Sequence, residues 1–188
     1  RDILQNFLAG ILILITEPFV IGDQIVFNDF EGTVEHIQTR ATTIRTYDGT
    51  KIVIPNAELF TNSVKVNTAF EKRRLQYDIG IGYGDDIAEA KKIILEVLRD
   101  NPEALSDPAP EALVVDLAAS TINIRARWWV NPPRRAEVID SQDEVLTQLC
   151  NKLVAGGIDL PFPTQQILFH DQTESTDGDR AKQREGWP

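Results

Sequence analysis

The chain begins with a short, uninterrupted hydrophobic segment. Residues 7 to 15 read FLAGILILI, a run without a charged residue, whereas a helix that spans a bilayer needs roughly 20 apolar residues. Pro18 ends the segment, because proline cannot continue a helix and favours extended geometry at the preceding residue. Two interpretations fit this pattern equally: a helix or strand buried in a core, or the end of a membrane helix or interfacial segment whose upstream part is missing.

Apolar and polar positions partly alternate over short stretches between residues 22 and 66, which is typical of half-buried strands. The strands are expected at residues 24–27, 32–37, 42–46 and 51–54. Between the last two, Asp48 and Gly49 predict a tight hairpin, because these residue types tolerate the positive φ angles of two-residue turns. Four or five short strands in so small a region predict a small barrel or sandwich.

A charged stretch at residues 67–74 is the expected boundary before a second unit with a different pattern. The elements predicted there are a strand at 75–81, a helix at about 85–99, strands at 112–118 and 121–130, a helix at about 136–155 and a last strand at 166–169. This β-α-β-β-α-β order is the ferredoxin-like split βαβ arrangement. Residues 171–188 lack apolar periodicity and are expected to be disordered.

The composition narrows the possible functions. Of 188 residues, 42% are hydrophobic and 26% are charged, which predicts a globular protein with one large domain or two small ones. The 19 basic and 29 acidic residues give a net charge of −10, which disfavours nucleic acid as a partner. One cysteine and two distant histidines predict neither a disulfide nor a zinc site, and no cofactor is expected. Because the first residue is Arg1, we expect a fragment of a longer protein.

A glycine-rich stretch, GIGYG at residues 80–84, lies between a predicted strand and a predicted helix, where such loops can bind phosphate. Its spacing does not match the dinucleotide-binding fingerprint. Asp85 and Asp86 would also place two negative charges where a phosphate would lie, whereas carboxylates stabilise a helix N-terminus. We therefore interpret the two aspartates as helix caps.

No set of side chains predicts catalysis, and the protein is interpreted as a non-enzyme. Cys150 has no histidine near it in sequence, which is typical of a small semi-buried residue. His36 and His170 are isolated and are interpreted as ordinary surface or packed residues. Trp128 and Trp129 are adjacent on a strand and so point to opposite faces, which predicts one core residue and one surface residue.

Residues 42–56 carry the most specific pattern in the chain. They read TTIRTYDGTKIVIPN and resemble the signature of the small-conductance mechanosensitive (MscS-like) channel family. The positions assigned to the family signature are Thr43, Arg45, Asp48, Gly49, Pro55 and Asn56. The resemblance includes Gly10 and Pro18 before this stretch and Pro161 after it, and covers residues 3 to 170.

The resemblance implies a homoheptameric channel of the inner (plasma) membrane that opens under tension and releases ions and small osmolytes on hypo-osmotic shock. Its fold class would be α+β, with the amphipathic end of a pore helix (residues 1–16), an Sm-like β-barrel domain (17–66) and a ferredoxin-like α/β domain (67–170). This fragment would lie mostly on the cytoplasmic side. A strand for a barrel between subunits would be formed by Gln166, Ile167, Leu168 and Phe169.

Within this resemblance, Asn6, Phe7 and Gly10 are candidates for coupling the pore helix to the β domain. Asn6 is polar within an apolar segment, so it should face protein or water, and we expect it to link the helix to the β domain by a hydrogen bond that locks one state. Lipid is expected to contact this helix and the missing upstream helices. Glu17 departs from the family pattern, in which a basic residue is common, so attraction to anionic lipid is not implied.

Two other classes of function remain open. One is a soluble Sm-like RNA-binding module, which would need a basic, aromatic face that this acidic chain does not predict. The other is a ferredoxin-like ligand-binding regulator, which saturable binding of a small molecule would favour.

Overall fold

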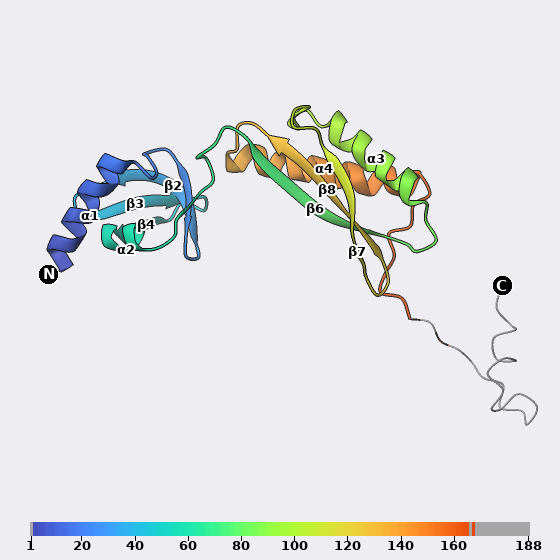
Figure 1. Ribbon diagram of the computed structural model, residues 1–188, viewed down its shortest axis with the longest axis horizontal. Helices are drawn as coiled ribbons and strands as arrows, with labels where there is room; N and C mark the ends of the chain where they lie inside the picture. Colours follow the sequence, from blue (N-terminus) through green and yellow to red (C-terminus); the bar gives the residue numbers. More distant parts are fainter. Residues whose placement is uncertain (1, 166, 168–188) are drawn as a thin grey trace, which may run out of the picture.

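The computed structural model describes residues 2–165 and residue 167. The elements in chain order are α1 (Asp2–Thr16), β1 (Gln24–Phe27), β2 (Phe30–Ile37), β3 (Ala41–Thr46), β4 (Lys51–Pro55), α2 (Asn56–Thr61), β5 (Lys65–Val66), β6 (Arg73–Ile81), α3 (Ile87–Asp100), β7 (Glu111–Leu117), β8 (Ile122–Val130) and α4 (Arg135–Ala155). They form two units with separate sheets and separate cores (Figure 1). We call α1 to β5 the β unit and β6 to α4 the α/β unit. The expected α+β fold class is confirmed.

The β unit is one antiparallel sheet with the strand order β4-β3-β2-β1-β5. All four predicted strands are present, whereas the short elements α2 and β5 carried too little periodicity to be predicted. β4 and β5 are the edges, and within the described residues no ladder joins them, so the sheet is open at these edges. Ile13 of α1 contributes to the core of this sheet, which α1 therefore helps to cover.

The hairpin between β3 and β4 lies at the predicted position but differs in type. Thr46 N–H donates to Thr50 O at 2.8 Å, and Gly49 N–H donates to Thr46 O at 3.0 Å. The connection therefore has three residues, and of these only Gly49 has a positive φ, at 87°. A turn followed by a left-handed glycine is the common alternative to the two-residue turn that the sequence suggested.

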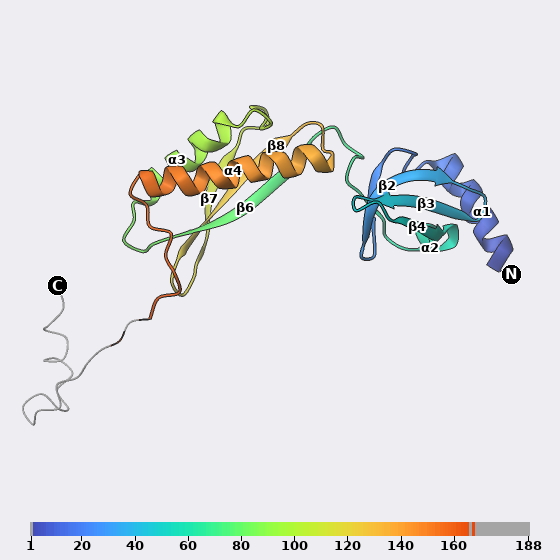
Figure 2. The ribbon, with the colours of Figure 1, turned by 180° about the vertical axis from the view of Figure 1, so that it is seen from behind.

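The α/β unit is a three-stranded sheet with the order β6-β8-β7. Since β6 and β7 both pair antiparallel with β8, they are parallel to each other and separated by it, which is the predicted split βαβ arrangement. Both helices lie on the same face of this sheet (Figure 2). Alternate residues of β8 are buried towards them, among them Trp128, which is fully buried, whereas Trp129 is partly exposed as expected.

The two aspartates of the glycine-rich loop act as caps, as predicted. Asp86 is the N-cap of α3, and its Oδ1 accepts from Ala88 N–H at 2.8 Å and Glu89 N–H at 3.2 Å. Asp85 Oδ2 accepts from Gly82 N–H at 2.8 Å. The protein's own carboxylates thus occupy the positions that an anion would take.

The structure differs from the sequence-based predictions at Cys150 and at Ile167. Cys150 is exposed rather than semi-buried, because the buried stripe of α4 runs through Val145, Leu149 and Leu153, and Cys150 is rotated off it by one residue. Of the expected barrel strand, Ile167 is exposed and in no strand. The rest of that strand, His170 and the tail at 171–188 lie outside the described residues.

The capping role of Asp86 at the start of α3 can be tested by substitution. Asp86→Ala removes the acceptor of two backbone N–H groups and should lower the free energy of unfolding by about 0.5–2 kcal/mol. Asp86→Asn is the matched control, because asparagine caps as well as aspartate and should change the stability much less. Urea unfolding followed by circular dichroism measures both; equal losses in the two variants would contradict the capping role.

Candidate functional site

Helix α1 meets the β unit at a close backbone contact centred on Gly10. A Cβ atom added to Gly10 would lie 2.5 Å from Asn56 Nδ2 and 2.6 Å from the backbone oxygen of Thr39. Real Cβ atoms do not approach this closely, so only glycine allows this contact. Together with Ala9 and Ile13, Gly10 forms the buried face of α1. The helix is therefore positioned by a residue that has no side chain.

Asn56 forms the other side of this contact and is fully buried. Its Oδ1 accepts from Thr42 Oγ1 at 2.9 Å, its Nδ2 donates to Gln38 O at 2.8 Å, and its N–H donates to Arg40 O at 3.0 Å. These bonds fix the turn between β2 and β3 against the start of α2. Pro55 precedes it with extended backbone, φ −56° and ψ 133°, and so ends β4 where α2 begins. Asn56, the last signature residue, therefore forms part of the surface on which α1 rests, and Pro55 precedes it at the start of α2.

Asn6 links α1 directly to α2. Its Oδ1 accepts from Ala57 N–H at 2.9 Å, and its Nδ2 donates to Asp2 O at 2.9 Å. Ala57 lies in the first turn of α2, where backbone N–H groups have no acceptor within the helix. The hydrogen bond to the β domain that the sequence led us to expect is thus present. Its role in locking a state stays a prediction.

Phe7 lies three residues before Gly10, beside it on the surface of α1, and is 43% exposed. It belongs to an apolar face that nothing in the described chain covers. Its members are Ile3, Leu4, Phe7, Leu8, Ile11, Leu14 and Ile15, all exposed. Phe7 therefore lies beside the docked face of α1 but, unlike Gly10, is not buried in it.

The remaining signature residues shape β3 and its hairpin. Thr43 is buried, and exposed Arg45 pairs with Glu35 across β2 and β3 at 2.9 Å. Asp48 accepts from the Thr46 hydroxyl group, and this bond holds the pKa of the Asp48 carboxyl below its usual value. Gly49 supplies the left-handed backbone of the turn. These four residues have structural roles that require no ligand.

The two units meet at Arg135, the first residue of α4, which sequence patterns did not single out. Its N–H donates to Gln24 Oε1 at 2.7 Å, and its Nη1 donates to Glu31 Oε2 at 2.9 Å. The guanidinium carbon lies 4.4 Å from the centroid of the Tyr47 ring. Burial, and secondly the charge of Glu31, raises the pKa of Tyr47. We call Arg135, Gln24, Glu31 and Tyr47 the unit junction.

Metal binding and membrane spanning each have a structural requirement that the described residues do not meet. Within residues 2–165 and 167, no cluster of three or more His, Cys, Asp or Glu side chains could hold a metal ion. His36 is exposed and makes none of the side-chain hydrogen bonds found in this part of the chain. Nor is any helix of the described chain both long and apolar enough to cross a membrane. The arrangement can instead transmit a displacement of α1 to the β unit through packing and one hydrogen bond.

Gly10→Ala tests the close contact. Because the added Cβ would meet backbone as well as the Asn56 side chain, we expect α1 to be displaced, with a loss of about 1–3 kcal/mol of stability. Hydrogen exchange at the Ala57 N–H should become faster as its bond to Asn6 is lost. Gly84→Ala is the matched control: nothing lies within 4 Å of the added Cβ, and the change should be neutral or stabilising by up to about 1 kcal/mol. Unchanged exchange at Ala57 in Gly10→Ala would refute this role.

Arg135→Met tests the unit junction by removing the ion pair and the ring contact. Both side chains of the pair are partly exposed, 40% for Arg135 and 32% for Glu31, so each contact contributes only about 0.2–1 kcal/mol. We therefore expect a broader distribution of distances between the units without unfolding. Spin labels on exposed Cys150 and on Lys51→Cys would measure it, with Arg99→Met, an exposed arginine in the last turn of α3, as control. Equal broadening in both variants would show that Arg135 does not restrain the units.

Comparison with known proteins accounts for both units. Residues 2–67 match the family described as "Mechanosensitive ion channel, beta-domain", and residues 75–160 match "Mechanosensitive ion channel MscS, C-terminal". An uncharacterized MscS family protein of Archaeoglobus fulgidus is 31% identical over 98% of this chain and 64% of its own length. The small-conductance mechanosensitive channel MscMJ of Methanocaldococcus jannaschii is 33% identical over 90% of this chain, which spans 49% of that protein.

Solved structures agree with these matches. The closed-state crystal structure of Helicobacter pylori MscS superposes with a TM-score of 0.81 at 26% identity, covering 91% of this chain and 67% of that one. The structure of Arabidopsis thaliana MSL1 has a TM-score of 0.72 at 23% identity, covering 87% and 60%, and shows likeness of fold. The chain thus spans between about half and two thirds of these proteins. From its signature, its two matched regions and its fold, the chain belongs to the MscS family of mechanosensitive ion channels.

Proposed function

We propose that this chain forms part of an ion channel that opens under membrane tension and releases ions and small osmolytes on hypo-osmotic shock. The channel lies in the inner (plasma) membrane, with most of this chain on the cytoplasmic side. The observation that carries the proposal is the two-sided nature of α1. One face is docked on the β unit through Gly10 and Asn6, and most of the remaining helix surface is apolar and exposed. Such a face needs lipid or neighbouring helices to cover it.

In this proposal α1 is the end of the pore helix, and its contact with the β unit is the gating connection. Tension favours the state that occupies the larger area in the membrane plane. Because α1 belongs to the pore helix in this proposal, the open and closed states would differ in the position of α1. The contact through Gly10 and the bond from Asn6 to Ala57 both depend on that placement. The likeness to a closed-state MscS structure supports assigning the observed arrangement to the closed state. Phe7, on the exposed face, would contact lipid or a neighbouring subunit.

The channel is proposed to be a homo-oligomer of seven copies. Self-association is supported by β7, an edge strand of its sheet that exposes four apolar side chains: Leu113, Val114, Val115 and Leu117. Unpaired, apolar strand edges are normally covered in stable proteins. We assign residues 1–16 to the pore helix, 17–66 to the β domain and 67–170 to the α/β domain. The barrel between subunits is assigned to residues 166–169.

Patch-clamp recording of the full protein that contains this chain tests the proposal. It is expressed in membranes without other mechanosensitive channels, and suction is raised at fixed voltage. Stepwise currents that appear only under tension are the expected result. Silence up to membrane rupture, with the assembled protein shown to be present, would contradict the channel function itself.

Asn6→Ala tests the gating connection in the same recordings. Loss of its bond to Ala57 N–H should destabilise the closed state by about 0.5–1.5 kcal/mol per subunit, so the variant should open at lower tension. Asn62→Ala is the matched control, because the Nδ2 of Asn62 donates to Glu58 O at the end of its own helix, and among the described residues Asn62 makes no hydrogen bond to α1. A threshold that shifts equally in both variants, or in neither, would mean that Asn6 does not couple α1 to the β unit.

A further inference from the structure

The turn between β2 and β3 is held from inside the protein by one buried residue, Asn56. Asn56 makes a hydrogen bond to every second residue of this stretch, and its three partners are Gln38, Arg40 and Thr42. The backbone oxygen of Thr39 lies between the first two of these partners, and it is one of the two groups that exclude a Cβ atom at Gly10. The position of α1 therefore depends on how firmly Asn56 is held.

Thr42 is the partner that reaches Asn56 through a side chain, whereas the other two bonds run to backbone oxygen atoms. Thr42 and Asn56 are both 0% exposed. Gln38 O can only accept a hydrogen bond, so the amide atom that faces it must be the nitrogen, and the oxygen must face Thr42. Among the described residues, the Thr42 hydroxyl group is the only donor to Asn56 Oδ1, at 2.9 Å.

Without the Thr42 hydroxyl group, Asn56 Oδ1 would be a buried acceptor with no donor. Such a group is destabilising, and water cannot replace the lost bond at a residue that is fully buried. Turning the amide by half a circle would not relieve it, because Oδ1 would then face Gln38 O, which also only accepts. Relief requires Asn56 to move, and the turn on which α1 rests would move with it.

We propose that Thr42 is a positioning residue for the gating connection. Its hydroxyl group holds Asn56, Asn56 holds the turn between β2 and β3, and the turn sets the position of Gly10 in α1. No hydrogen bond among the described residues joins Thr42 to α1 itself, so it acts through Asn56. The proposal rests on the proposed channel function, in which the docked position of α1 belongs to the closed state. Loss of the hydroxyl group therefore favours the open state.

Patch-clamp recording of Thr42→Val in the full protein tests this role, because valine has nearly the same shape as threonine but cannot donate. At the tension that opens half of the wild-type channels, the ratio of open to closed channels should rise by at least about tenfold. Thr43→Val is the matched control: Thr43 is also buried on β3, and it makes none of the side-chain hydrogen bonds found among the described residues. Equal opening tensions in the two variants would overturn the proposal.

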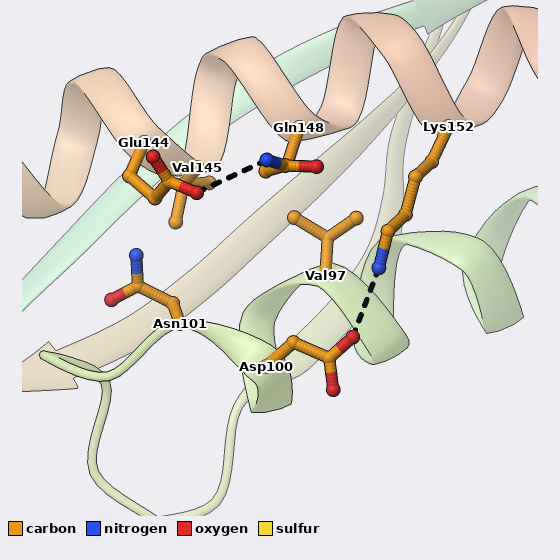
Figure 3. A pocket seen from close by; sticks show the side chains of 7 residues that line it. All are labelled: Val97, Asp100, Asn101, Glu144, Val145, Gln148 and Lys152. Atoms are coloured by element: carbon orange, nitrogen blue, oxygen red, sulfur yellow. Dashed lines mark hydrogen bonds and ion pairs between the residues drawn. The ribbon is translucent and has the colours of Figure 1, made fainter.

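A hydrogen bond in the α/β unit provides an exposed counterpart. At the edge of the pocket between α3 and α4, Gln148 Nε2 donates to Glu144 Oε1 at 3.1 Å (Figure 3). This bond is exposed to solvent, so water can replace a partner that is removed. Gln148→Leu should therefore leave the opening tension unchanged. A tension lowered as much as in Thr42→Val would show that the effect does not depend on Asn56, and would overturn the proposal.

Two further substitutions of Thr42 separate hydrogen bonding from packing. Thr42→Ser keeps the hydroxyl group but loses a buried methyl group, so it should unfold at lower urea concentration while its opening tension stays near that of the wild type. Thr42→Cys has a weak donor and should open at an intermediate tension, which also keeps the test informative if Thr42→Val does not assemble. An opening tension that is lower in Thr42→Ser than in Thr42→Cys would follow packing and would overturn the proposal.

Hydrogen exchange in the full protein measures the docking of α1 without relying on the channel function. The Ala57 N–H donates to Asn6 of α1, so it should exchange at least about tenfold faster in Thr42→Val than in Thr43→Val. Equal exchange in the two variants would overturn the role of Thr42. If the wild-type protein gives no current under tension, the proposed function fails, and the exchange rates still decide whether Thr42 positions α1.

Discussion

The close contact at Gly10 is the constraint on which the placement of the first helix depends. A single missing Cβ lets α1 rest on the backbone of the β2–β3 turn and on Asn56. Asn56 can form that surface only because its three hydrogen bonds hold it in one orientation while fully buried. Asn6 adds a directed bond to what would otherwise be apolar packing. Sterics thus set the distance of the helix, and hydrogen bonds set its position along the sheet.

The interior of each unit is apolar and closely packed, whereas the contact that joins the two units is polar. Each unit has its own apolar core, and cores resist small displacements because they are closely packed. The unit junction at Arg135 is instead polar and partly exposed, and its contacts are individually weak. A displacement of α1 would therefore move the β unit as a whole. The weak contacts of the unit junction would be the first to change.

Much of the fold could be predicted because periodicity reports burial locally. The alternation along β8 showed which residues face the helices, and Trp128 and Trp129 follow it. The signature residues located the hairpin and the start of α2, although the loop has three residues rather than two. Cys150 was misjudged because one position of rotation on a helix separates a buried residue from an exposed one. α2 was missed because one and a half turns carry almost no periodic signal.

The sequence by itself determined the longer elements, most of the faces they bury and the resemblance to the family, since these depend on neighbours within a few residues and on the pattern at residues 42–56. It also singled out Asn6, because a polar residue in an apolar run needs a partner. Only the tertiary structure decided that this partner is Ala57, that Arg135 joins the units to Glu31, and that Ser141 donates to Asn101. Those pairs are separated by many residues along the chain, and no local pattern records which distant group a side chain will meet once the chain has folded.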